Sequence, residues 1–236
     1  MPIKKIAPNF TNFEQASGII FKNKELLRRA FTHRSYLNEN RKAELSHNER
    51  LEFLGDAVLE LIVTEYLFEK YPDCSEGDLT AYRASLVNAI TLSEVAQKIG
   101  VNDYLLLSKG EAKDTGKARQ YILANTMEAI IGAIYLDQGY DIARYFISKN
   151  LFYLIEKIVA DKSWLDAKSK FQEKAQEKEG LTPLYKSLKE EGPDHDKHFT
   201  VGVYLDKELI TEGIGKSKQE AEQEAARKAL EIKNWL

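Results

Sequence analysis

Residues 47–71, HNERLEFLGDAVLELIVTEYLFEKY, carry the strongest structural signal in the chain. The apolar residues of this segment recur at helical spacing, and at 100° per residue Glu49, Glu52, Asp56 and Glu60 fall within about 80° of one another. No Lys or Arg lies on this acidic stripe, although like charges one turn apart destabilise a helix. The stripe is either an ordinary solvated face or one side of a cation site, because the carboxylates of Glu52 and Asp56 can converge on a hard ion such as Mg²⁺.

A second helix, containing YILANTMEAIIGAIYLD at 121–137, supplies the other side of such a site. Glu128 lies in a segment that is apolar on most faces, where an unpaired carboxylate is costly, and Asn125 lies on the same face. If this pair faces Glu52 and Asp56, four oxygen ligands surround one or two Mg²⁺ ions. Such an arrangement activates water and stabilises the leaving oxygen in phosphodiester hydrolysis. The alternative is a hydrogen-bonded Asn125–Glu128 pair in the core.

The composition sets broad limits on fold and location. The chain has 236 residues, 43% hydrophobic and 30% charged, which is typical of one or two globular domains. Its net charge of −3 argues against nucleic-acid binding over the whole surface. A single cysteine, Cys74, and only 4 His favour a reducing compartment, and therefore the cytoplasm, over a disulfide or zinc framework. Charges interrupt every long apolar stretch, so we expect neither a signal peptide nor a membrane span.

The chain divides into two domains near residue 160. Before this point the apolar spacing is helical throughout. The expected helices cover 9–17, 23–33, 48–70, 76–87, 88–99, 103–108, 119–137 and 139–159. We therefore predict an all-α domain over residues 1–160.

Residues 161–236 have a different pattern. A helix is expected at 167–179, followed by strands at 183–189, 199–205 and 208–214. The Ser217 hydroxyl can accept the N–H of Glu220 at the start of a last helix, and the Glu220 carboxylate can accept the N–H of Ser217. This reciprocal pair is a capping box. The order α-β-β-β-α predicts a small α+β domain.

These segments resemble a known family. HNERLEFLGDAVLEL at 47–61 resembles the signature helix of ribonuclease III, and other blocks of that family follow in order. They are LLRRAFTHRSY at 26–36, SEGDLTAYRASLV at 75–87, LSKGE at 107–111 and ILANTMEAIIGAIYLDQG at 122–139. The C-terminal domain resembles the double-stranded-RNA-binding domain of bacterial members, so the resemblance covers nearly the whole chain.

The resemblance implies a homodimeric endoribonuclease that uses Mg²⁺, with Mn²⁺ as a substitute. The signature helices, 48–70, pair in the dimer, and each subunit cuts one strand of double-stranded RNA in rRNA and mRNA precursors. The products carry a 5′-phosphate and a short 3′ overhang. By resemblance, the metal positions are Glu52, Asp56, Asn125 and Glu128, with Asp56 and Glu128 as the catalytic pair. Glu49 and Glu76 correspond to acids that support the site or the dimer.

Asn125 departs from the family pattern, which usually has Asp at this position. An amide oxygen can coordinate Mg²⁺ but lacks the charge that attracts the ion. Three interpretations stay open: a branch that tolerates Asn, an introduced replacement that slows cleavage, or a double-stranded-RNA-binding protein with weak or no cleavage.

The RNA-binding prediction rests on position, because residues 164–236 hold 13 Lys and Arg against 15 Asp and Glu. Lys216 and Lys218 flank the start of the last helix, where the helix dipole favours phosphate. His195 lies in a polar loop that resembles the loop entering the RNA minor groove. The alternative is that Lys218 and His195 are plain surface residues.

The first helix of this domain offers a second contact face. Ser169, Gln172 and Gln176 share one side of it and can meet 2′-hydroxyls in another minor groove.

Overall fold

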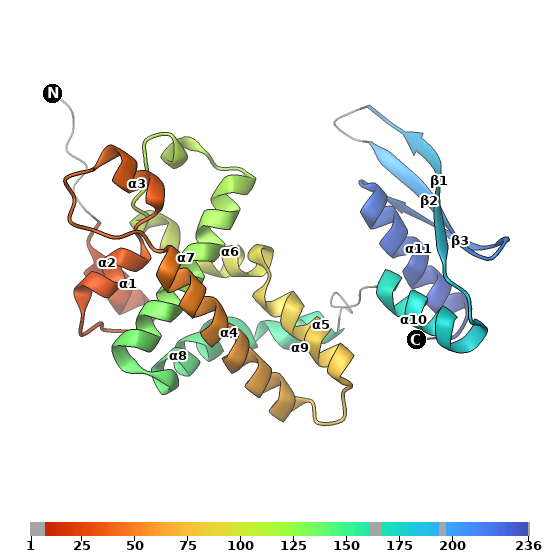
Figure 1. Ribbon diagram of the computed structural model, residues 1–236, viewed down its shortest axis with the longest axis horizontal. Coiled ribbons are helices and arrows are strands. Elements are labelled where there is room, and N and C mark those ends of the chain that lie inside the picture. The colour runs from red at the N-terminus through yellow and green to blue at the C-terminus, as the bar shows by residue number, and fades with distance from the viewer. Residues whose placement is uncertain (1–7, 161–166, 194–196, 236) are drawn as a thin grey trace. The chain divides into compact units, whose positions relative to one another are not determined.

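The computed structural model describes residues 8–160, 167–193 and 197–235, and the chain forms two compact units, Met1–Trp164 and Leu165–Leu236. The described part of the first unit is helical, and the second holds a three-stranded sheet with two helices (Figure 1). The fold class predicted from the sequence is therefore confirmed.

Two central helices organise the first unit. They are α4 (Glu49–Lys70) and α7 (Lys117–Gln138), each of 22 residues, and they share the most extensive packing between any two described elements. A Cβ atom added at Gly55 would lie 1.8 Å from the Glu128 carbonyl oxygen, and one added at Gly132 would lie 2.2 Å from the Leu51 carbonyl oxygen. The two backbones therefore touch directly where the helices cross, which only glycine permits.

Shorter helices surround this pair. They are α1 (Phe10–Ser17), α2 (Lys24–Ala30), α3 (Arg34–Glu39), α5 (Glu76–Val87), α6 (Ala89–Lys98), α8 (Tyr140–Ile147) and α9 (Leu154–Ala160). Side chains at the preceding positions accept backbone N–H groups and so begin several of these helices, as Ser75 does for α5 and Asn88 for α6. Fully buried residues such as Leu59, Ile62 and Ile130 form the core between α4, α7 and their neighbours.

The structure differs from three of the predicted helices. The segment 103–108 is not an α-helix: a 3₁₀ turn covers Val101–Tyr104, and the Leu106 N–H then donates to the Phe31 carbonyl at 2.9 Å. The predicted helix 139–159 is interrupted by a π-helical turn at Ser148–Phe152. The helix predicted at 23–33 ends at Ala30, because the next residues form a bridge to Leu106 before α3 begins.

The second unit has the predicted order. Its elements are α10 (Ala167–Glu179), β1 (Leu184–Glu191), β2 (His198–Leu205), β3 (Glu208–Gly215) and α11 (Lys218–Ile232). The sheet is antiparallel in the order β1-β2-β3, and its buried residues Val203 and Leu205 pack with both helices. A Cβ atom at Gly213 would lie 2.2 Å from the Ala221 carbonyl oxygen, so α11 lies directly on β3.

The capping box that begins α11 is confirmed in part. The Ser217 hydroxyl accepts the Glu220 N–H at 3.1 Å, as predicted. The Glu220 carboxylate accepts the N–H of Lys216 at 2.9 Å, one residue earlier than the motif predicts.

Candidate functional site

The crossing of α4 and α7 positions the predicted site residues. Glu52 and Asp56 flank Gly55 on α4, and the Glu128 backbone of α7 lies against Gly55. Asn125 lies about one turn before Glu128 on the same face of α7. The close approach of the backbones brings the two polar faces together.

Proximity and charge link these side chains across the crossing. The Asn125 amide lies near enough to Glu52 on the facing helix to influence the pKa of that carboxyl. Burial, with the nearby charges of Glu49 and Asp56, raises the pKa of Glu52, while the Asn125 amide opposes this shift. Burial and the charges of Asp56 and Glu52 raise the pKa of Glu128 to about 7. The three carboxylates therefore share one electrostatic environment.

The acidic stripe is neutralised only at its ends. Glu49 lies 3.4 Å from Arg34, and Glu60 lies 4.0 Å from Arg83. Within the described residues, no Lys or Arg forms an ion pair within 4.0 Å of Glu52, Asp56 or Glu128, the three central carboxylates. The middle of the stripe thus differs from an ordinary solvated face, where mixed charges compensate one another.

The donor set fits a hard divalent cation. Three carboxylates and one amide supply oxygen ligands, and a bound cation would offset the burial and the charge repulsion that raise the pKa of Glu128. As the side chains lie, no group of three or more His, Cys, Asp or Glu in the described ranges is gathered closely enough to hold a metal ion. Ligation therefore requires the carboxylates to turn toward a common point.

Glu76 lies apart from the other predicted residues. It is in the first turn of α5 and accepts a hydrogen bond from Thr80 at 3.1 Å. It lines a groove of about 430 Å³ beside the C-terminal half of α4. The other lining residues are Thr64, Leu67, Phe68, Cys74, Leu79, Thr80 and Arg83. No described hydrogen bond or ion pair joins Glu76 to Glu52, Asp56 or Glu128 within the chain.

Tyr121 was not predicted as a site residue. Its side chain is 59% exposed, and it lies one turn before Asn125 on the same face of α7. Between Tyr121 and Glu128, only these two residues and Asn125 are not buried. Tyr121, Asn125 and Glu128 therefore form one accessible face of α7. The spacing of these residues in the sequence could have indicated Tyr121 as a further site residue.

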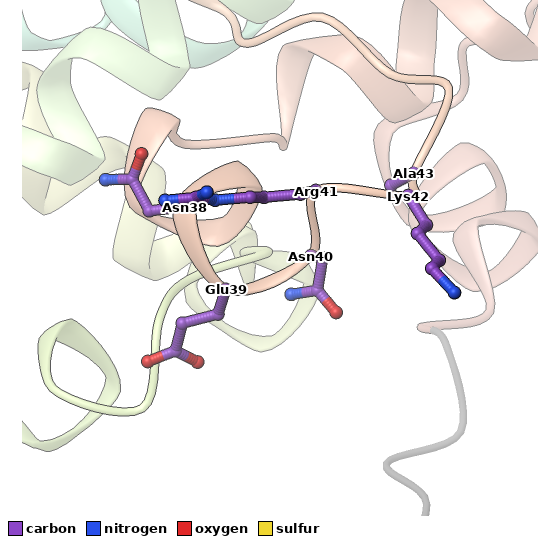
Figure 2. A pocket seen from close by; sticks show the side chains of 6 residues that line it. All are labelled: Asn38, Glu39, Asn40, Arg41, Lys42 and Ala43. Carbon is purple, nitrogen blue, oxygen red and sulfur yellow. The ribbon is translucent and has the colours of Figure 1, made fainter.

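The hollow in Figure 2 is a separate feature. It lies at the end of α3 and the start of the connection to α4. Its lining residues are Asn38, Glu39, Asn40, Arg41, Lys42 and Ala43. The Glu39 carboxylate accepts the Lys109 N–H at 3.2 Å and so ties this segment to the loop before α7. None of the predicted site residues lines it.

The predicted RNA contacts of the second unit lie on its described surface, except His195, which falls outside the described residues. Ser169, Gln172 and Gln176 are exposed on α10, and Lys216 is exposed before α11. Lys218, the first residue of α11, is 57% exposed and forms an ion pair of 2.7 Å with Glu190 of β1. The sequence analysis did not identify Glu190.

An acidic helix crossing in an all-helical unit, followed by an α-β-β-β-α unit, is typical of a nuclease domain joined to a double-stranded-RNA-binding domain. Comparisons with known proteins agree with this class. A sequence profile described as Ribonuclease-III-like matches residues 23–155, and one for the double-stranded RNA binding motif matches residues 167–233. The chain belongs to the ribonuclease III family and is a ribonuclease.

Similar proteins span nearly the same length. A protein named Ribonuclease 3 from Bdellovibrio bacteriovorus is 45% identical over 223 residues, which cover 94% of this chain and 95% of its own. Another from Anoxybacillus flavithermus is 47% identical over 221 residues, covering 94% and 92%. The nuclease domain of ribonuclease III from Campylobacter jejuni, described with a flexible region involved in dimer formation, is 42% identical. Its structure has a TM-score of 0.54 and covers 60% of this chain and 98% of its own.

Within the described ranges, no helix combines the length and the apolar composition that crossing a bilayer requires.

Proposed function

We propose that this chain is a Mg²⁺-dependent endoribonuclease that cleaves double-stranded RNA, with Glu52, Asp56, Asn125 and Glu128 holding the cation. The observation that carries the proposal is the meeting of three carboxylates at the Gly55 crossing, where burial and the charges of Asp56 and Glu52 raise the pKa of Glu128 to about 7. Mn²⁺, which accepts the same oxygen ligands, is the expected substitute.

Each side chain has a distinct role in this proposal. Asp56 and Glu128 would hold the cation as the catalytic pair, and Glu52 and Asn125, which lie near each other on facing helices, would complete the ligand set. A bound divalent cation supplies Lewis-acid activation of water and charge stabilisation of the leaving oxygen. Tyr121, exposed on the same face, is placed to contact the sugar-phosphate backbone of the strand being cut. The products then carry a 5′-phosphate and a 3′-hydroxyl.

Cleavage of a perfect RNA duplex tests the proposal. We expect cleavage with Mg²⁺, none with EDTA, and 5′-phosphate products with a short 3′ overhang. Glu128→Gln should abolish cleavage and leave duplex binding intact, because the binding motif lies in the other unit. Glu94→Gln, an exposed acid on α6, is the matched control and should cleave normally. Unchanged cleavage by Glu128→Gln would remove this residue from the site.

A homodimer that pairs through α4 is part of the proposal. Phe53 is 81% exposed, and Leu61 and Phe68 are 58% and 72% exposed on the same helix, an unusual density of apolar side chains in water. A second copy that covers this face would also bring its own residues to the groove lined by Glu76. Sedimentation should show a dimer that Phe53→Glu disrupts, whereas Tyr145→Glu, exposed on α8, should not. A dimeric Phe53→Glu variant contradicts this interface.

The second candidate function is a double-stranded-RNA-binding protein with weak or no cleavage, which Asn125 alone supports. It is not favoured, because relatives about 45% identical over most of the chain are named Ribonuclease 3. Processing of rRNA and mRNA precursors, and the cytoplasmic location inferred from the single cysteine, stay predictions. Sequencing of RNA ends in cells with and without the protein would identify the transcripts.

A further inference from the structure

One carboxylate of the second unit lies between two lysine ammonium groups. Glu190 lies near the C-terminal end of β1, and its Oε1 atom is 2.7 Å from the Lys218 Nζ at the start of α11. Its Oε2 atom is 3.6 Å from the Lys197 Nζ, just before β2. We call these three residues and Phe199 the Glu190 cluster.

The strand register explains why these residues meet. Glu190 pairs with Phe199 across the β1–β2 ladder, so their side chains lie on the same side of the sheet. The ammonium groups of Lys197 and Lys218 lie 5.9 Å and 5.6 Å from the centre of the Phe199 ring. In Figure 1, the N-terminal end of α11 lies at the end of the sheet where β1 stops and β2 begins. The cluster is thus a property of the fold of this unit alone.

Lys218 is the part of this cluster that suits an anion best. Its ammonium group stands at the N-terminus of α11, where the helix dipole adds to the positive potential. The bond from Lys218 and the charge of Lys197 lower the pKa of Glu190 from its ordinary value, so the carboxylate is ionised at neutral pH. An RNA phosphate that approaches Lys218 therefore meets a position already held by a carboxylate.

We propose that Glu190 is an internal competitor of RNA phosphate, which pairs with Lys218 and Lys197 in the free protein and must be displaced when duplex RNA binds. This inference rests on the proposed binding of double-stranded RNA through Lys218. Glu190 then lowers the affinity for RNA and limits the time that a cleaved product stays bound.

The competition has a distinct effect on salt dependence. A phosphate that binds Lys218 releases a cation condensed on the RNA, and this release steepens the fall of affinity with salt. The Glu190 carboxylate that the phosphate displaces attracts a cation from solution, which offsets part of the release. Removing the Glu190 charge should therefore both strengthen binding and steepen the salt dependence, whereas loss of an unrelated negative charge should mainly shift affinity.

The experiment compares two neighbouring substitutions in the full chain. Glu190→Gln and Glu191→Gln remove the same charge one residue apart, but Glu191 pairs with Lys189, 2.6 Å away, and not with Lys218. Binding is measured by fluorescence anisotropy with an RNA duplex of about 20 base pairs, longer than one such domain spans, in EDTA to prevent cleavage. Thermal unfolding of each variant confirms that both are folded.

We expect Glu190→Gln to bind about two- to fivefold more tightly at low salt, with a logarithmic salt slope steeper by up to about one. Glu191→Gln should change affinity less than about twofold with an unchanged slope. In a Lys218→Ala background, Glu190→Gln should lose most of its effect, because the pair no longer exists. This coupling separates local competition from a general change of charge.

Two results overturn the inference. If the two Gln variants behave alike, or if Glu190→Gln has its full effect without Lys218, Glu190 does not compete for that lysine. The proposed binding function then survives, because all variants still bind RNA. If neither the parent chain nor any variant binds the duplex at low salt, the proposed RNA binding fails and the competition fails with it.

Discussion

Replacing Gly55 with Ala would place a methyl group 1.8 Å from the Glu128 carbonyl oxygen, where ordinary contact begins at 3.4 Å. The facing atoms belong to the backbone of α7 and cannot rotate away, so α4 and α7 must separate locally by about 1.6 Å. Overpacking of this kind costs about 1–3 kcal/mol of unfolding free energy, and occasionally more. The same displacement moves Glu52 and Asp56 away from Glu128.

Activity should fall further than stability. A misplacement of about 1 Å in a catalytic arrangement can reduce the rate about 100-fold, so Gly55→Ala should lose at least this factor in kcat/KM on an RNA duplex with Mg²⁺. Urea unfolding measures the stability loss, and initial cleavage rates measure activity. Gly77→Ala is the matched control, because its nearest atom, the Ser75 Oγ, is 3.8 Å away. It should keep normal activity.

The result that refutes this reasoning is clear. A Gly55→Ala protein with parental stability and parental cleavage would mean that the two helices do not cross in backbone contact. A variant that fails to unfold cooperatively supports the contact, provided that Gly77→Ala folds normally.

Three further predictions concern charge. Asn125→Asp should lower the Mg²⁺ concentration for half-maximal cleavage, because a carboxylate attracts the ion more strongly than an amide does; identical Mg²⁺ titrations would exclude coordination at this position. Lys218→Ala should flatten the logarithmic salt slope of duplex binding by about one, and an unaltered slope would show that Lys218 touches no phosphate. Without divalent cations, the free energy of unfolding should fall as the pH rises from about 4.5, the ordinary pKa of glutamate, to about 7. Folding raises the pKa of Glu128, so the folded state binds the proton of this carboxyl more tightly than the unfolded state does. Urea unfolding at pH 5 and pH 8 should show a loss of about 1–3 kcal/mol that Glu128→Gln lacks, and equal pH profiles would contradict the raised pKa.

The sequence by itself determined the elements whose signals are local. The helical spacing of residues 47–71 and the alternation of residues 199–205 predicted α4 and β2, because side-chain periodicity follows directly from backbone geometry. Ser217 predicted the start of α11, because its hydroxyl accepts the N–H of Glu220 only three residues later. The acidic stripe and the shared face of Asn125 and Glu128 were also visible at this level.

The tertiary structure decided the features that depend on distant segments. The segment 103–108 has helical spacing, yet the backbone of Leu106 pairs with residues 31–33, and no local pattern reveals such a partner. Gly55 and Gly132 look like ordinary helix glycines until the crossing shows that a side chain at either position would strike the other backbone. This contact positions Glu52 against Asn125.

The Glu190–Lys218 pair depends on folding for the same physical reason. The two residues lie on different elements, and they meet only because the antiparallel register places Glu190 beside Phe199 while α11 packs across β3. Local sequence determines which face a side chain occupies, since that follows from helix and strand periodicity. Which charges oppose one another is decided by packing, because the contacts that select a helix crossing or a strand register are made between segments far apart in the chain.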